Sequence, residues 1–454
     1  MKTAKNRKLK KNQFLVQIVR ISKRLILVVG TSLILLLLVV GSLGQIQSII
    51  RSLGGDELYS RKDIIQDWLL AKAILTGGNP YLPIQDLAQQ YLGPIPTVQN
   101  GAHPTPHPPT AGLILIPMAF FQYHTVVYYW LLIEIMCLIA ASYFMLRTVE
   151  FKRIWIAIAI LIPVFLAWGE ILENLFLAQL VILQLFLLSA AWFCLKQERF
   201  GIAGLLVGFS LLIKPTVWPV AFIFLIHRKY RGILACVAVV LTGYAVSAIT
   251  LGTATVYNYF AVVVPAVDRV YASSIWNISL RTLGPKLFQG TSSSIHNAIS
   301  APPLFDAGAL ATPVGVLLPL FLILSVVLAA RRVNILAGFA LLTGITIVVS
   351  PVAWGTYVIM LAILMMWLVY RFITGRMRKG EAGTAVILML ILFPQWKMWV
   401  VIAQLLAGQT TTPSYPITIG AGVSLVTMIP TMAVVALLGL TVRLETRHGS
   451  SIVH

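Results

Sequence analysis

Two aspartates four residues apart, Asp63 and Asp67, have the spacing and chemistry of a general base. They lie in residues 61–76, a stretch that predicts a short helix ended by a glycine pair. Side chains four apart share one face of a helix, and neighbouring carboxylates raise each other's pKa. A carboxylate is the usual group for removing a proton from an acceptor hydroxyl. The pair therefore predicts acid–base chemistry on a hydroxyl substrate.

Both aspartates also have a structural interpretation. Ser60 and Asp63 have the spacing of a capping box, with Ser60 as the N-cap residue and Asp63 at the third helical position. Asp67 has no capping role. The structural interpretation of Asp67 is that its side chain lies on a solvated helix face. The spacing alone leaves catalytic and structural roles open for both residues.

Two histidines occur in the stiff stretch His103-Pro-Thr-Pro-His107-Pro-Pro. Two histidines four apart can bind zinc from a helix, but prolines exclude a helix here and no third ligand accompanies them. We therefore expect no metal site. Both histidines are interpreted as turn residues, with contact to a substrate as the alternative and His107 as the candidate.

Two lysines stand at the edges of apolar segments, where a charge is costly and usually functional. Lys214 precedes Pro215 at a predicted hairpin tip, and its ammonium group could hold a phosphate as a point charge. The alternative is that it snorkels to the membrane interface. Lys397, between Trp396 and Trp399, is interpreted as an interfacial anchor that could also reach a phosphate.

Three glutamates lie in or beside apolar runs. Glu134 falls in the middle of one apolar run. This position is equally consistent with a structural acid that has a buried partner and with a functional acid. Glu170 and Glu173 fall at an outer turn and are interpreted as solvated side chains.

The elements that position these residues are membrane-spanning helices. The chain has 454 residues, of which 59% are apolar and 11% are charged, whereas a soluble domain has about 25% charged residues. Apolar runs of about 20 residues, the length that crosses about 30 Å of hydrocarbon, recur along the chain. The composition therefore predicts an all-α polytopic membrane protein.

The net charge of +20 follows the membrane topology. Nine Lys or Arg and no acid precede Leu25, so the positive-inside rule places the N-terminus in the cytoplasm. This pattern indicates topology and attraction to anionic lipid headgroups, and it does not favour a nucleic-acid partner. Further basic clusters recur at 147–153, 196–199, 228–231, 331–332, 371–379 and 443–447.

Alternating the faces gives about 12 spans with both termini in the cytoplasm. The first is interpreted as a retained signal anchor, because it is too long for a signal-peptide core. Residues 25–441 form one predicted domain between a basic tail, 1–24, and a second cytoplasmic tail, 442–454. The spans are 25–50, 125–146, 154–170, 176–195, 200–213, 216–228, 231–251, 309–330, 334–351, 354–371, 382–405 and 418–441.

Two long extracytoplasmic loops are predicted, at 51–109 and 252–308. The first holds five of the 14 acids. Residues 110–123 are apolar but too short to span, so we expect them to lie in the interface or to re-enter the membrane. The acids thus gather on the predicted outer face.

Other motifs add little chemistry. Cys137, Cys194 and Cys236 lie inside apolar runs, which is typical of packing residues. Asn277-Ile-Ser fits the pattern of an N-glycosylation acceptor, a weak signal when it occurs once. No Gly-x-x-x-x-Gly-Lys phosphate-binding pattern occurs, so no nucleotide site is expected.

The run from Asp63 to Tyr81 resembles the first-loop signature of glycosyltransferase family 87, which has the GT-C type of membrane fold. That signature has an Asp, an aromatic-rich helix, then Gly and Pro-Tyr, with 14 residues from Asp to Gly, as from Asp63 to Gly77. This spacing favours Asp63 over Asp67 as the family's Asp.

Five further segments resemble the family's motifs in the same order. Two of these segments differ from the family's motifs. Ala178 precedes Gln179 where the family has a glycine, and the region of Tyr357 follows the Ser-Pro-x-x-Trp motif where the family has a histidine. The segments are His107-Pro-Pro-Thr, Ala178-Gln179-Leu, Gly204 to Lys214-Pro215, Trp276-Asn277-Ile-Ser-Leu280 and Ser350-Pro-Val-Ala-Trp354.

The resemblance implies a GT-C-like bundle that transfers a sugar from a polyprenyl-phosphate donor to a lipid or glycan acceptor. Mannose is the sugar that the resemblance favours. The resemblance also implies Asp63 as general base with Asp67 as helper, inversion at the anomeric carbon, and no cofactor. Lys214 would neutralise the departing phosphate. The remaining candidate substrate contacts are His107, Gln179, Asn277, Arg281, Trp354 and Tyr357.

Two other interpretations remain open. A transporter or lipid flippase would also have about 12 spans, but would predict two similar halves and a central site, and no such halving is visible. A catalytically inactive relative that serves as an assembly partner is the second. The expected location is a bacterial plasma membrane.

Overall fold

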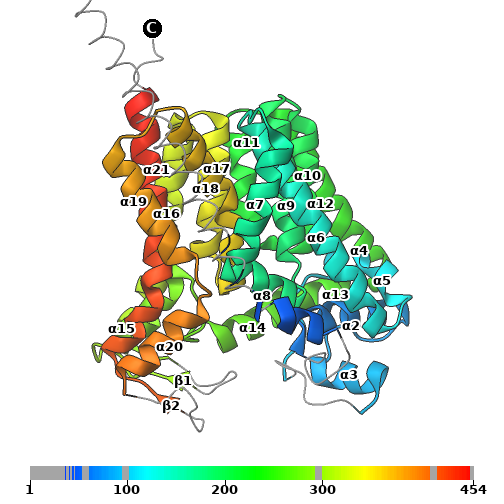
Figure 1. Cartoon of the computed structure of the whole chain (residues 1–454). Coiled ribbons are helices and arrows are strands. Elements are labelled where there is room, and N and C mark those ends of the chain that lie inside the picture. The colour runs from blue at the N-terminus through cyan, green and yellow to red at the C-terminus, as the bar shows by residue number, and fades with distance from the viewer. Residues whose placement is uncertain are drawn as a thin grey trace, which may run out of the picture.

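The computed structural model describes residues 36, 40, 43–44, 46–53, 61–94, 102–291, 299–408 and 417–449. Helices dominate these residues, and the prediction of an all-α membrane protein is confirmed (Figure 1). Two short strands, β1 (Ile299–Ser300) and β2 (Ile417–Thr418), pair in parallel. The predicted tail 1–24, most of the first span and Ser60 lie outside the described residues.

Five helical segments are long and apolar enough to cross a membrane. Two are single helices, and three begin with a tighter turn that continues into an α-helix. They are α6 (Tyr123–Thr148), α12 (Tyr230–Leu251), η5–α16 (Gly308–Leu310 and Ala311–Arg332), η6–α18 (Gly355–Leu361 and Ala362–Ile373) and η7–α21 (Gly422–Met428 and Ile429–Gly449).

Two further spans are broken. Helices α7 (Ile154–Ala167) and α8 (Gly169–Leu177) meet at 76°, and α19 (Lys379–Leu392) and α20 (Lys397–Leu406) meet at 82°. The second break interrupts the predicted span 382–405, and Pro394, which has no backbone N–H, lies within the break. The described residues thus hold five to seven candidate spans.

Four shorter apolar segments complete the bundle, and they explain why about 12 spans are not confirmed. At 1.5 Å per residue, a helix of 14–16 residues is about 21–24 Å long, which falls short of the hydrocarbon core. They are α9 (Val181–Lys196), α10 (Phe200–Ile213), η2–α11 (Pro215–Ala221 and Phe222–Ile226) and α17 (Ile335–Val349).

The described parts of the two predicted long loops contain several short helices, which Figure 1 shows at one end of the bundle. Residues 110–123, predicted to lie in the interface or re-enter, fall mainly in two of them. The short helices are α2 (Ile64–Leu75), α3 (Ile84–Leu92), α4 (Pro109–Ile114), α5 (Ile116–Ala119), α13 (Thr253–Asn258), η3 (Tyr259–Val263), α14 (Val264–Tyr271), η4 (Leu280–Thr282) and α15 (Leu283–Phe288).

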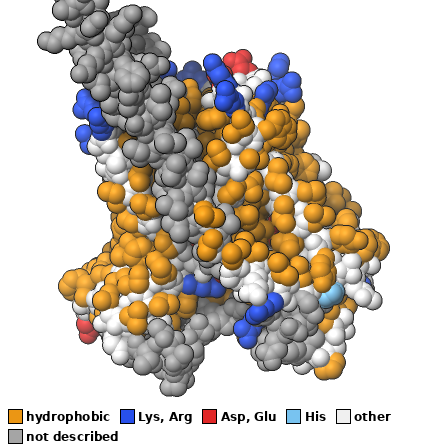
Figure 2. Space-filling model, viewed as in Figure 1, with side chains coloured by type: hydrophobic (Ala, Val, Ile, Leu, Met, Phe, Trp, Pro, Cys, Tyr) orange, Lys and Arg blue, Asp and Glu red, His pale blue; other side chains and the backbone are white. Residues whose placement is uncertain are grey.

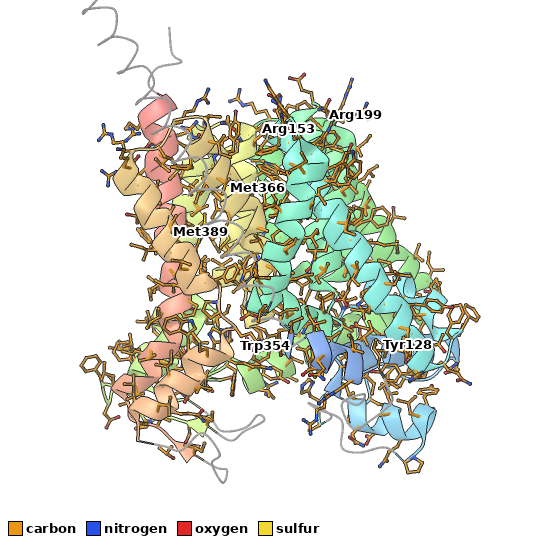
Figure 3. All side chains as sticks on the ribbon, viewed as in Figure 1. Tyr128, Arg153, Arg199, Trp354, Met366 and Met389 are labelled. Atoms are coloured by element: carbon orange, nitrogen blue, oxygen red, sulfur yellow. The ribbon has the colours of Figure 1, made fainter. Side chains whose placement is uncertain are left out.

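The two ends of the bundle differ in charge. Arg153 and Arg199 lie at the upper end of the view, whereas Trp354 and Tyr128 lie towards the end with the short helices (Figure 3). Hydrophobic side chains cover the flank, and Lys and Arg gather at the upper end, with a few near the lower end (Figure 2). The chain is therefore an integral membrane protein. Which end faces the cytoplasm stays a prediction.

Glycines let two helices of the bundle approach closely. A Cβ atom at Gly204 of α10 would lie 2.1 Å from the carbonyl oxygen of Gly232 on α12, and one at Gly208 would lie 2.9 Å from Val239. Small residues permit such contacts between membrane helices. Helix α10 ends at Ile213, so this packing also positions Lys214.

Candidate functional site

Asp63 lies at the start of α2 and is held by the end of α8. Its backbone N–H donates to the carbonyl oxygen of Leu177 at 2.8 Å, and its carboxylate accepts a hydrogen bond from the side-chain amide of Gln179. Helix α2 begins at Ile64, so Asp63 occupies the N-cap position and makes no capping bond. The predicted capping box, with Asp63 at the third helical position, is therefore wrong.

The turn that presents Gln179 depends on Ala178. Its φ is +56° and its ψ is +57°, a left-handed conformation that favours glycine. The family has glycine at the position of Ala178. The left-handed backbone conformation explains why that motif contains a glycine. The turn brings Gln179 back towards the first residues of α2.

Burial is the main influence on the protonation of Asp63. It raises the pKa of Asp63 against the opposing ammonium groups of Lys214 and Lys397, the carboxylates of Asp67 and Glu173 also raise it, and the resulting pKa is about 7. Part of the side chain remains accessible. A carboxylate whose pKa is near neutral is suited to remove a proton from a hydroxyl.

Asp67 is buried and hydrogen-bonded to Nδ1 of His107. The His107 backbone is held in turn, because its carbonyl oxygen accepts a bond from the Tyr81 hydroxyl at 3.2 Å. The interpretation of Asp67 as a solvated side chain is therefore wrong. The two residues are 40 positions apart, and the proline-rich stretch brings them together.

His103 forms a second pairing that the sequence did not indicate. Its Nε2 is hydrogen-bonded to the hydroxyl of Tyr271 on α14, and the Tyr271 ring packs edge-on against Trp354 at 5.0 Å. Burial and the nearby negative charge of Asp63 raise the pKa of Tyr271, so it stays a neutral hydrogen-bonding group. Tyr271 and Trp354 thus form an aromatic wall near Asp63.

Lys214 supplies a cation without an acidic partner. It follows α10 in an extended conformation, is 8% exposed, and its Nζ lies 4.2 Å from the centre of the Tyr357 ring. Among the described residues none forms a hydrogen bond or ion pair with Nζ. This burial contradicts the snorkelling alternative, and it leaves the ammonium group available to an anion.

Asn277 is fully buried, and its amide is fully engaged within the protein. It donates to the carbonyl oxygens of Tyr271 and Pro351 at 3.2 and 3.0 Å, and accepts from the N–H groups of Ser279 and Ala353 at 2.9 and 3.0 Å. These four bonds use all the hydrogen-bonding capacity of the side chain. Asn277 therefore holds the surrounding loops in place, and it does not make the predicted substrate contact. Because its side chain is buried, it is not accessible as a glycosylation acceptor.

Helix α8 also carries two acids that hold the broken span α19–α20. Glu170 accepts from the backbone N–H of Trp396, and Glu173 forms an ion pair with Lys397. Both glutamates are buried, so the interpretation as solvated side chains is wrong. Lys397 was predicted to be an anchor, and the structure adds this partner.

Arg281 forms an ion pair with Asp268 of α14 at 2.7 Å. Its role as a substrate contact stays a prediction. Cys137 and Cys236 are buried and Cys194 is half-buried, and all three are free thiols. Within the described ranges, no three His, Cys, Asp or Glu side chains form a group that could hold a metal ion.

The arrangement combines a half-buried carboxylate with an unpaired cation at one end of a helical membrane bundle. This defines a membrane protein whose site can deprotonate a hydroxyl beside a negatively charged group. The model of glycosyltransferase family 87 matches residues 106–351, more than half of the chain. The chain therefore belongs to glycosyltransferase family 87. This finding supports an enzyme over the transporter alternative.

Two curated relatives have the same description, alpha-(1->3)-arabinofuranosyltransferase, from two strains of Mycobacterium tuberculosis. Each is 26% identical over 136 residues, which cover 29% of this chain and 31% of the relative. The chain thus matches less than a third of the length of these relatives. No solved structure matches the chain.

Proposed function

We propose that this chain transfers a glycosyl group from a polyprenyl-phosphate donor to a hydroxyl of a lipid or glycan acceptor. The observation that carries the proposal is the Asp63 carboxylate, with a pKa of about 7, in electrostatic contact with the unpaired Lys214 ammonium group. A base and a free cation are the two groups that such a transfer needs.

The chemistry follows from these two groups. Asp63 takes the proton of the acceptor hydroxyl, and the acceptor oxygen forms a bond to the anomeric carbon. The bond from that carbon to the phosphate oxygen breaks, and its electron pair stays on the phosphate. The leaving phosphate gains one negative charge, which Lys214 stabilises. Attack opposite the leaving group inverts the anomeric configuration.

A lipid-linked donor fits the position of the site. Phe120 beside α5 is 70% exposed and Tyr257 of α13 is 73% exposed, both in the short-helix layer. Exposed aromatic side chains are typical of the membrane–water boundary. A polyprenyl chain in the adjacent leaflet would bring its phosphate to this level. We assign this end to the extracytoplasmic face, with the termini in the cytoplasm of a bacterial cell.

Two sugars are supported as the transferred group. The resemblance to family 87 implies mannose, and the named activity of the Mycobacterium tuberculosis relatives favours arabinofuranose. Both would be carried by a polyprenyl phosphate, which already supplies the activation. The reaction therefore needs no nucleotide, and no metal or other cofactor is invoked.

The test is transfer by the purified protein in lipid nanodiscs. Radiolabelled polyprenyl-phosphate-mannose and polyprenyl-phosphate-arabinofuranose are offered with lipid and glycan acceptors. Transfer from one donor is expected, and Asp63→Asn should abolish it. Asp86→Asn, which changes an exposed acid on the neighbouring helix α3, is the matched control. Full activity of Asp63→Asn would remove Asp63 from the mechanism, and no transfer from either donor would reject the donor class.

A further inference from the structure

A buried acid and a buried lysine lie close to the candidate base. Glu134, on the span α6, is 1% exposed, and neither of its carboxylate oxygens has a hydrogen-bond partner among the described residues. An ionisable group in a membrane span is costly unless a group of opposite charge compensates it. Lys62, the residue before Asp63, interacts electrostatically with Glu134 without forming a direct ion pair.

Lys62 is only 2% exposed, although it belongs to the short-helix layer. Its Nζ donates to the carbonyl oxygen of Phe176 at 2.6 Å and lies 5.2 Å from the centre of the Phe176 ring. Burial lowers the pKa of Lys62 to about 8, and the negative charge of Glu134 opposes this change. Lys62 thus reaches into the protein towards an acid that otherwise has no partner.

Lys62 and Asp63 are both attached to the same short piece of chain. Lys62 binds the carbonyl of Phe176, the Asp63 backbone binds the carbonyl of Leu177, and the Asp63 carboxylate binds Gln179. The last carbonyls of a helix carry partial negative charge, so the ammonium group is well placed at the end of α8. The backbone N–H of Gln179 closes the same turn by donating to the carbonyl oxygen of Asn174 at 3.1 Å.

We propose that Lys62 and Glu134 are positioning residues, which fix the end of α8 and thereby hold the Asp63 carboxylate in the orientation that catalysis needs. Neither side chain touches the reacting atoms. The proposal rests on the proposed function only in naming Asp63 as the base. Small displacements of a reacting group reduce the chemical step more than they reduce binding.

Lys72, on the helix α2 that follows Lys62 and Asp63, provides a matched control. Its Nζ also donates to a carbonyl oxygen, that of Ala119 at 3.0 Å, and it also lies over an aromatic ring, that of Trp68 at 5.8 Å. The first contact is with α5 and the second is within α2, so neither involves α8. Lys72→Met therefore removes the same kinds of contact as Lys62→Met without releasing Asp63.

The experiment compares these variants in nanodiscs with whichever polyprenyl-phosphate sugar the wild type accepts. Lys62→Met should lower kcat by about tenfold or more while the donor KM changes by less than about threefold. Lys62→Arg should restore most of the loss, and Lys72→Met should stay within about twofold of the wild type. A kcat for Lys62→Met within about threefold of Lys72→Met would overturn the proposal.

Glu134→Gln keeps the proposal testable if Lys62→Met does not fold. It should also lower kcat, and adding it to Lys62→Met should recover part of the activity, because it removes the uncompensated carboxylate. A folded Glu134→Gln with wild-type kcat would contradict the proposal.

A cryo-electron-microscopy map of Lys62→Met bound to a Fab tests the position of Asp63 without any donor. A displaced Asp63 supports positioning, and an Asp63 still bonded to Gln179 rejects it.

Discussion

Nδ1 of His107 is hydrogen-bonded to the carboxylate of Asp67, one helical turn beyond Asp63. Both side chains are buried, so Asp67 is engaged within the protein and Asp63 is the accessible carboxylate. The relationship gives the two aspartates different roles. Asp67 raises the pKa of Asp63, and in the proposed mechanism Asp63 acts on the substrate.

The pH dependence of transfer follows from this division. The pKa of Asp63 is raised to about 7, and a base works only when it is deprotonated, so kcat/KM should rise with pH and level off above about 7. Asp67→Asn removes a negative charge that raises this pKa, so the rise should move to lower pH. The measurement is kcat/KM against pH for both proteins. An unchanged or higher midpoint in Asp67→Asn would contradict the assigned coupling.

Lys214 should be required for donor binding and for departure of the phosphate. Lys214→Met removes the cation, and we expect kcat/KM to fall roughly a hundredfold, the size seen when one charge-stabilising group is lost. Lys214→Arg should retain part of the activity. The control is Lys72→Met, which removes a lysine whose Nζ donates to the carbonyl oxygen of Ala119 and which should stay close to the wild type. If Lys214→Met and Lys72→Met have equal activity, the phosphate role of Lys214 is wrong.

Asn277 should contribute more to stability than an ordinary capping asparagine. Asn277→Ala leaves the buried carbonyl oxygen of Tyr271 and the buried N–H groups of Ser279 and Ala353 without their partner, and each such group costs about 1–3 kcal/mol. It also frees the carbonyl oxygen of Pro351, which water can reach. Asn334→Ala removes one N-cap bond, to the N–H of Ala337, and should cost about 1 kcal/mol. Thermal unfolding in detergent measures both. A smaller loss for Asn277→Ala would show that the loops rearrange to satisfy these groups.

The sequence indicated the parts of the site that follow from local rules. The spacing from Asp63 to Gly77 and the Lys214-Pro215 step both rest on a few consecutive residues, and the structure brings Asp63 and Lys214 together. Apolar runs also placed most helices correctly. These signals are local because helix periodicity and turns depend on nearby residues.

The missed pairings depend on the tertiary structure. His103 and Tyr271 are 168 residues apart, and Glu173 and Lys397 are 224 residues apart, so no local pattern connects them. Glu170 and Glu173 resembled solvated acids because their partners come from the distant break in α19–α20. The prediction of about 12 spans is not confirmed by the described residues for a related reason. Short apolar helices look alike in sequence whether they cross the membrane or pack inside the bundle.

The contact between α10 and α12 should tolerate substitution at one glycine and not at another on the same helix. A Cβ at Gly204 would lie 2.1 Å from a backbone oxygen, which cannot move aside as a flexible side chain can, whereas a Cβ at Gly201 would meet nothing within 4 Å. Gly204→Ala should therefore push the helices apart, lower the unfolding temperature and reduce activity, because Lys214 follows α10 directly. Gly201→Ala should be neutral or slightly stabilising, because alanine favours the helix. Thermal unfolding and donor KM measured for both variants decide the matter, and equal behaviour of the two would show that this contact does not position Lys214.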